Sequence, residues 1–259
     1  MSRRFFQDTR TVFVREIVPA LREPYSTVFA MAQPLLLLFL FGPLLAGTTG
    51  QGGWGGGEGA ASPWQWFVPG TLIMMCLSGP MLAGYSLLIE LLGGSMERML
   101  VTPLNRASML VGRILKEFVI LLAQAAVLIG LAVPLGLRLP VAGVLAALAL
   151  LIVFGTGLGA LSFVLAIASQ PSGQLFWAVT QVVAFPLMLL SGVLLPIDHG
   201  PAWLRTAAAL NPVTYVVEAE RALFAGRFAD LSVLYGVAAA AAVAAIGLTW
   251  GTRAMRRGV

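Results

Sequence analysis

The sequence predicts an all-α polytopic membrane protein with six transmembrane helices. Of its 259 residues, 59% are hydrophobic and only 10% are charged, whereas a soluble domain carries about 25% charged residues. Five long runs contain no charged residue at all: 24–57, 59–89, 118–137, 139–197 and 231–252. Helices are the expected spanning elements, because backbone polar groups in lipid must be satisfied within the segment itself. The runs are also too long and too uniformly apolar for barrel strands.

Residues 3–22 precede the first charge-free run and predict an amphipathic helix lying in the membrane interface. At helical spacing, charged residues such as Arg15 fall on one side, and the opposite side holds Phe6, Phe13, Ile17 and Leu21. Such a two-sided pattern is typical of a helix that lies on the bilayer. A simple basic tail that only fixes orientation is the alternative.

The charge-free runs define the spans, because a helix needs about 20 apolar residues to cross a bilayer. The 139–197 run is long enough for two spans, and the turn-forming cluster at 169–174 divides it. The predicted spans are 25–46, 66–91, 108–136, 141–168, 174–196 and 231–252. The fourth span is rich in small residues, which allow helices to approach closely.

The distribution of basic residues predicts that both termini lie in the cytoplasm. Twelve of the sixteen Lys and Arg residues fall in the N-terminal tail, the loop after the second span, and the C-terminal tail. Only Arg138, Arg205, Arg221 and Arg227 fall on the opposite side. Basic loops stay in the cytoplasm. Because the basic residues are dispersed and lack interleaved aromatics, we expect no nucleic-acid partner.

Residues 93–106 form a short polar segment between the second and third spans, on the predicted cytoplasmic side. Ser95 is placed to cap a short helix, which Thr102-Pro103 would end. Its apolar positions lie at helical spacing, and Glu97 and Arg98 are expected to be exposed. Such a helix could dock into a groove on a soluble partner or lie on the lipid surface, and both interpretations stay open on the residues alone.

Residues 198–230 are predicted to lie outside the membrane as two short helices broken at Asn211-Pro212. This segment is too interrupted to cross, yet more apolar than an ordinary loop. We expect a re-entrant pair of helices in the outer leaflet. Glu218 and Arg221 are three residues apart, so they can pair on one helix.

Several kinds of chemistry lack the residues they need. The chain has no Gly-x-x-x-x-Gly-Lys-Ser/Thr loop for binding phosphate. With one His and one Cys we predict no metal site, no catalytic residue and no bound cofactor. The spans are nearly free of ionisable groups, which disfavours an ion-coupled carrier. Arg113 and Glu117, at the cytoplasmic end of the third span, are expected to pair at i, i+4.

Two separated motifs give the chain a resemblance to the permeases of the ATP-binding-cassette type-2 exporter superfamily. The first reads Glu90, then Gly94-Ser95-Met96-Glu97-Arg98-Met99-Leu100-Val101-Thr102-Pro103, followed by Arg106. The second reads Ser191-Gly192-Val193-Leu194-Leu195-Pro196, Trp203-Leu204, Asn211-Pro212, Tyr215, Glu218 and Arg221. The resemblance covers essentially the whole chain and is closest to the daunorubicin-resistance and nodulation-factor export permeases.

The resemblance implies that residues 1–259 form a single permease domain in the cytoplasmic membrane of a bacterium. Two permease subunits, either identical copies or paralogues, would assemble with two separate cytoplasmic ATPase subunits, which would bind the ATP and Mg²⁺. The 93–106 helix would be the coupling helix in the ATPase groove, flanked by the 3–22 helix. The coupling residues implied are Gly94, Ser95, Met96, Glu97, Arg98, Thr102, Pro103 and Arg106. The external pair, including Trp203, Asn211, Pro212, Tyr215, Glu218 and Arg221, would bound the exit.

The expected cargo is an amphipathic or hydrophobic molecule, such as a drug, a polyketide or a glycolipid. Possible pathway positions are Met74, Met75, Phe185 and Met188, which are equally compatible with ordinary packing. Export of a polysaccharide or lipo-oligosaccharide is an alternative. A scaffold that only recruits an ATPase, and an ion-coupled carrier that works without one, belong to other functional classes.

Overall fold

In the computed structural model, the described residues are 2–22, 24–48, 63–93, 106–193 and 200–257, and they contain helices and no strands. The helices are α1 (Ser2–Arg22), α2 (Pro24–Thr48), α3 (Pro63–Leu92), α5 (Arg106–Ala132), α6 (Val141–Ala168), α7 (Gln174–Leu190), α8 (Ala202–Ala209), α9 (Pro212–Phe224) and α10 (Leu231–Arg257). The all-helical fold predicted from composition is confirmed for this part of the chain.

Four described helices are long and apolar enough to cross a membrane: Trp64–Leu92, Ser108–Ala132, Val141–Ala168 and Leu231–Ala254. They match the predicted second, third, fourth and sixth spans. The described apolar parts of α2 and α7 are shorter, at Val28–Leu40 and Gln174–Leu190. The chain is therefore a multi-pass membrane protein by its helices, and the count of six crossings stays a prediction.

Two helices end earlier than predicted, and each end has a local cause. The third span was expected to reach residue 136, but α5 ends at Ala132 and the chain turns through Gly136, whose φ is 104°. Pro134 lacks the N–H group that would continue the helix. The fifth span was expected to reach residue 196, but α7 ends at Leu190, and Gly192 follows with a φ of 72°. Glycine is the residue that adopts such angles at a helix end without steric cost.

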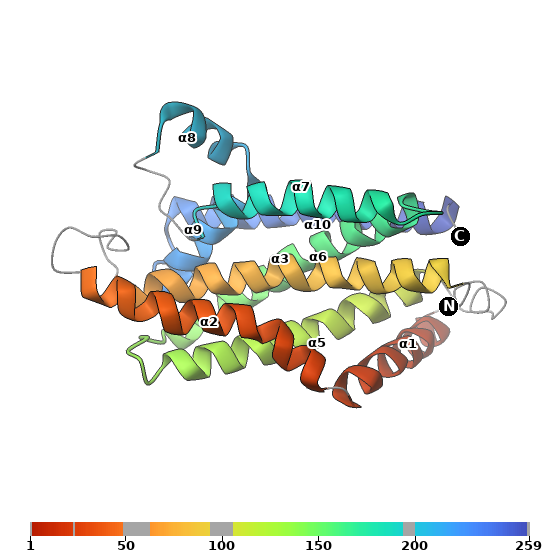
Figure 1. Cartoon of the computed structure of the whole chain (residues 1–259). Helices are drawn as coiled ribbons and strands as arrows, with labels where there is room; N and C mark the ends of the chain where they lie inside the picture. The colour runs from red at the N-terminus through yellow and green to blue at the C-terminus, as the bar shows by residue number, and fades with distance from the viewer. Residues whose placement is uncertain (1, 23, 49–62, 94–105, 194–199, 258–259) are drawn as a thin grey trace.

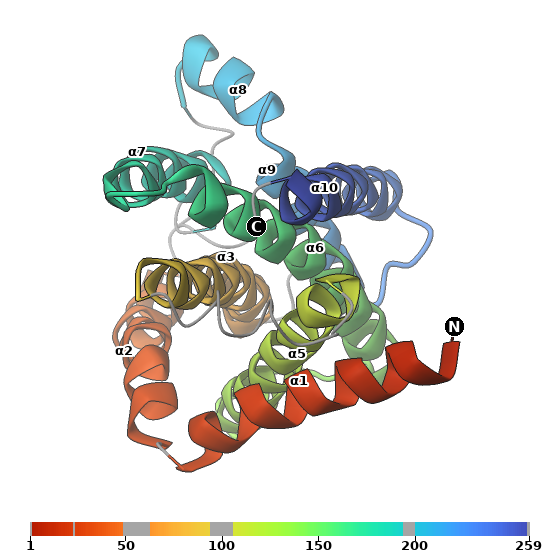
Figure 2. The same cartoon turned by 90° about the vertical axis from the view of Figure 1, so that its right-hand side faces the viewer.

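Helix α6 lies in the middle of the bundle and packs along α10 on one side and α3 on the other (Figures 1 and 2). The predicted role of its small residues is confirmed. A Cβ atom added to Gly157 would lie 2.6 Å from the backbone nitrogen of Ala244, so α6 and α10 are in backbone contact. Towards α3, the hydroxyl of Ser162 donates to the carbonyl of Met81 at 3.3 Å.

The remaining helices occupy the two ends of the bundle (Figure 1). Helix α1 lies at the end that also holds the C-terminus, where it crosses α5 (Figure 2). Helices α8 and α9 lie at the opposite end. The two short helices broken at Asn211-Pro212 are confirmed. They differ in environment, because most of α9 is buried against α3, α6 and α10, whereas most of α8 is exposed.

Candidate functional site

A buried ion cluster joins α1, α3 and α5 at the N-terminal end of the bundle. The guanidinium of Arg113 on α5 pairs with Glu90, two residues before the end of α3, and lies 3.5 Å from the carboxylate of Glu16 on α1. Its side chain is only 5% exposed. Gly112 makes this geometry possible, because a Cβ atom there would lie 2.9 Å from the Cβ of Val12 on α1. One cation thus ties α1 to two helices of the bundle.

The predicted pairing of Arg113 with Glu117 is wrong. Glu117 instead pairs with its neighbour Lys116, with 2.9 Å between Nζ and Oε1. Arg113 contacts two carboxylates from α1 and α3, while Glu117, one turn further along α5, lines a cavity. Spacing along one helix could not reveal this choice, because the partners of Arg113 come from other helices.

The predicted apolar side of α1 is partly buried against the rest of the protein and partly exposed. Ile17 is buried, and α1 packs against α5 through the neighbouring Val12. Phe13 is partly buried, whereas Phe6 and Leu21 are each 72% exposed. The charged Arg15 on the opposite side is also exposed. The helix itself is confirmed. The exposed Phe6 and Leu21 are the positions left to contact lipid, and that contact stays a prediction.

The predicted coupling segment lies almost entirely outside the described residues. Gly94, Ser95, Met96, Glu97, Arg98, Thr102 and Pro103 belong to residues 94–105, so their arrangement stays a prediction. Arg106 is the first residue of α5. The end of α3 and the start of α5, which flank this segment, lie at the same end of the bundle as α1 (Figure 1). The Arg113 cluster therefore connects both flanks of the segment to α1.

At the opposite end, Arg221 on α9 binds backbone carbonyls of two other segments. Its guanidinium donates to the carbonyls of Gly192 at 2.8 Å and Trp66 at 3.3 Å. It also stacks on the ring of Trp66, 3.9 Å from the centroid, which adds a cation–π contribution. These contacts join α9 to the start of α3 and to the backbone just after α7.

The other residues of the second motif stabilise the same junction. The Asn211 side chain caps α9 by accepting from the N–H of Val213 at 3.0 Å, and its amide donates to the carbonyl of Leu187 on α7 at 2.8 Å. Pro212 follows as the first residue of α9, which suits its fixed φ. The Tyr215 hydroxyl donates to the carbonyl of Ala209 at 2.7 Å. Glu218 and Trp203 are exposed.

Sequence reasoning missed Glu220, whose side chain is fully buried in α9. Neither of its carboxylate oxygens has a hydrogen-bond partner among the described residues. Helix α9 lies outside the candidate spans, and burial raises the pKa of Glu220 well above its ordinary value. A signal was present in the spacing, because Val216 and Phe224, four residues before and after it, are apolar and buried.

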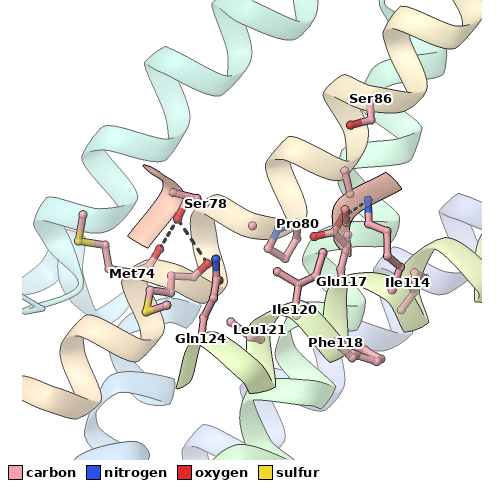
Figure 3. Close-up of a pocket in the computed structure, with 18 of the residues that line it drawn as sticks. Met74, Ser78, Pro80, Ser86, Ile114, Glu117, Phe118, Ile120, Leu121 and Gln124 are labelled. Carbon is pink, nitrogen blue, oxygen red and sulfur yellow. Dashed lines mark hydrogen bonds and ion pairs between the residues drawn. The ribbon is translucent and has the colours of Figure 1, made fainter. Parts of the chain in front are cut away.

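A cavity of about 370 Å³ lies between α1, α2, α3, α5 and α6 (Figure 3). Its walls are mostly apolar, and Met74 and Met75 line it, together with Ser78 and Gln124. Phe185 and Met188, the other two candidates for a cargo pathway, lie on α7, which contributes no residue to the lining. Phe185 is exposed and Met188 packs against the core. The four residues therefore do not share one cavity.

The described part of the chain contains no metal-binding cluster, and its cysteine is buried. Among the described residues, no group of three or more His, Cys, Asp and Glu side chains is arranged to hold a metal ion. Cys76 is fully buried in α3, and its thiol donates to the carbonyl of Leu151 at 3.6 Å.

The chain is similar in sequence to a known transporter family and to several permeases. The family model described as ABC-2 type transporter matches residues 7–225. A putative transport permease, ycf38, from Cyanophora paradoxa is 29% identical over 85% of this chain and 75% of its own length. The corresponding protein from Pyropia yezoensis is 25% identical over 86% of this chain and 76% of its own. A probable multidrug ABC transporter permease, YbhR, from Escherichia coli K12 is 24% identical over 62% of this chain, and the match covers only 44% of that protein.

Proposed function

The chain belongs to the ABC-2 type transporter family, and from this premise we propose that it is the permease subunit of an ATP-driven exporter. The partner is a separate cytoplasmic ATPase, which binds the ATP and Mg²⁺. The cargo is an amphipathic or hydrophobic molecule, in keeping with the mostly apolar bundle. The proposed location is the cytoplasmic membrane of a bacterium.

One observation supports the coupling part of the proposal. Arg113 ties α1 to α3 and α5, the helices on either side of residues 94–105. An ATPase that pushes on the 94–105 segment would therefore move α1, α3 and α5 together. Packed elements joined by buried ion pairs move as a unit. In this proposal Glu97 and Arg98 make the contact with the ATPase, and α1 flanks it.

A second permease subunit is proposed to pack on the face formed by α2 and α7. These helices lie on either side of α3 (Figure 2), and both expose large apolar side chains, among them Phe39, Trp177 and Phe185. A face of this kind is satisfied by lipid or by another copy of the chain. With the second copy there, Phe185 and Met188 would border the cargo pathway. Met74 and Met75 would meet cargo only if it enters the cavity.

Reconstitution of the chain with its ATPase in liposomes tests the proposal. The combined substitution Glu97→Arg and Arg98→Glu should abolish ATP-dependent efflux while the chain still inserts into the membrane. The matched control reverses the pair Arg227 and Asp230, whose side-chain atoms lie 3.5 Å apart in the turn between α9 and α10. That variant should keep its efflux.

Two results would contradict the proposal. Full efflux by the Glu97→Arg, Arg98→Glu variant would remove the coupling role of the segment. ATP hydrolysis by this chain alone would contradict the proposal that a separate subunit is the ATPase.

A second candidate function is an ion-coupled carrier, which the buried carboxyl of Glu220 favours. Helix α9 lies outside the candidate spans, but its buried carboxyl is the kind of protonatable group that proton coupling uses. Proteoliposomes given a proton gradient and no ATP decide between the two. We expect no transport under these conditions, and gradient-driven transport that Glu220→Gln abolishes would favour the carrier instead.

A further inference from the structure

The cavity behind α2 carries charge at one end only, and its other end is uncharged and mostly apolar, with Ser78 and Gln124 as polar members. Among its described lining residues, Lys116 and Glu117 are the only charged ones, and they pair with each other on α5. Gln124 lies seven residues further along α5, about 10 Å at the rise of a helix. Beyond the ion pair the walls are mainly apolar, as Figure 3 shows for Ile120, Leu121 and Met74. The cavity thus has the polarity of a site for one elongated amphiphile.

The predicted position of α1 in the membrane interface places the charged end of the cavity at the same depth. Helix α1 crosses α5 at Gly112, and Ala20 of α1 lines the cavity beside the ion pair. Because α1 exposes both Arg15 and Phe6, it has the two-sided character of an interfacial helix. The residues of α5 that it crosses lie at the same depth. With α1 in the interface, as predicted, Lys116 and Glu117 would reach the headgroup region, and the more apolar part of the cavity would extend into the leaflet.

The ion pair determines which headgroup fits. An ammonium and a carboxylate side by side complement a headgroup that carries both a phosphate and an amine. The phosphate would pair with Lys116 and the amine with Glu117, and both contacts would be charge-assisted hydrogen bonds. A headgroup with a phosphate alone would leave Glu117 facing a like charge. A simple cationic amphiphile would place its positive charge next to the ammonium of Lys116.

We propose that this cavity binds the headgroup and the first part of one acyl chain of a zwitterionic, amine-bearing phospholipid, with the headgroup on Lys116 and Glu117 and the chain directed along α3 and α5 towards Met74 and Gln124. The lipid is a resident component of the permease. It fills the space between α2 and α5, which touch each other only sparsely, while α2 packs mainly on α3. The proposal does not depend on transport or on an ATPase.

The test compares the lipids that the purified full-length chain retains. The chain is placed in nanodiscs of equal parts phosphatidylethanolamine and phosphatidylglycerol, extracted gently, and examined by native mass spectrometry. We expect one phosphatidylethanolamine per chain, retained in preference to phosphatidylglycerol. Glu117→Gln removes the partner of the amine and should reduce this preference about tenfold, the value of one charge-assisted hydrogen bond.

A cavity-filling variant has a matched control. Gly79 lines the cavity, and a Cβ atom there meets nothing within 4 Å, so Gly79→Leu should fill the space and release the lipid. Gly130 on α5 is equally open but exposed and outside the cavity, so Gly130→Leu should retain the lipid. Gly79 directly precedes Pro80, so a second variant at a different position is needed. Ser78→Phe should fill the same cavity.

Three results would overturn the proposal. The first is a wild-type chain that retains no phospholipid or shows no headgroup preference. The second is the same retained lipid in folded Gly79→Leu and Ser78→Phe variants. The third is a retained small molecule of another class that these variants release.

Discussion

Arg113 shows how much one residue can determine in a membrane bundle. It is a buried cation that meets two carboxylates from different helices. A buried ion pair contributes little net stability over an apolar replacement of all partners, but removal of one partner leaves uncompensated charge. The residue therefore makes the position of α1 depend on α3 and α5. That dependence gives the proposed coupling segment a mechanical connection to the interfacial helix.

Arg113→Leu should destabilise the chain strongly, because it leaves Glu16 and Glu90 without their shared cation. The expected loss is about 3–5 kcal/mol, seen as a lower unfolding temperature of the purified chain in detergent. Arg113→Lys keeps the charge but not the planar fork, so its loss should be smaller. Arg205→Leu, at an exposed position of α8, is the control and should change little. An Arg113→Leu chain as stable as the wild type would show that the cluster does not hold α1.

Substitution of Glu220 is expected to stabilise the chain near pH 8, in contrast to substitution of Arg113. Burial raises its pKa in the folded chain above the value of about 4.3 in the unfolded chain. The folded state is therefore favoured below pH 4.3, and this contribution is lost as the pH rises towards the folded pKa. Glu220→Gln carries no charge at any pH, so it should raise the unfolding temperature near pH 8 and change it little near pH 4. Destabilisation at both pH values would instead indicate a bound partner of the carboxyl.

At the scale of the elements, backbone contact between α6 and α10 organises the bundle. The contact is reciprocal, because a Cβ atom on Gly247 of α10 would lie 2.3 Å from the carbonyl oxygen of Gly157 on α6. In lipid, helices have no hydrophobic drive to associate, so close van der Waals packing through small residues takes its place. The two glycines therefore determine how near α10 can approach the centre.

Gly157→Ala should force α6 and α10 apart and lower the stability by about 1–3 kcal/mol, the usual cost of overpacking. Gly130→Ala adds the same methyl group where nothing lies within 4 Å. We expect it to stay within about 1 kcal/mol of the wild type. Thermal unfolding of both variants in the same detergent measures the difference. Equal stabilities would mean that the contact at Gly157 relaxes without cost.

At the scale of the whole molecule, the two ends of the bundle differ in kind. One end carries α1, the C-terminus and the Arg113 cluster, and the other carries α8, α9 and the Arg221 junction. Both termini lie at the same end (Figure 1), as an even number of crossings requires. This separation is consistent with the proposed exporter, in which the ATPase would act at one end and cargo would leave at the other.

Cysteine labelling tests this arrangement in the membrane. In a Cys76→Ala background, Ala229→Cys should react with a membrane-impermeant maleimide from outside the cell, because it is exposed beside α9. Arg10→Cys on α1 and Arg253→Cys near the end of α10 are both exposed, and they should react only after the membrane is permeabilised. Labelling of Arg10→Cys and Arg253→Cys from opposite sides would contradict an even number of crossings.

The amino-acid sequence by itself determined the helices and most of their limits. The charge-free runs marked the long apolar helices, the cluster at 169–174 separated α6 from α7, and Asn211-Pro212 separated α8 from α9. These signals are local, because proline, glycine and capping residues act on the backbone beside them. The helix ends that sequence reasoning placed too late, at α5 and α7, were missed because a turn within an apolar run leaves no change in hydropathy.

Only the tertiary structure decided which side chains meet. The partners of Arg113, the burial of Glu220 and the division of Met74 from Phe185 all depend on how each helix is rotated and where it crosses its neighbours. Periodicity within one helix carries little of that information when nearly every residue is apolar, because no polar face marks the outside. The rotations were determined instead by close contacts at glycines such as Gly112 and Gly157, and by a few buried polar groups that had to find partners on other helices.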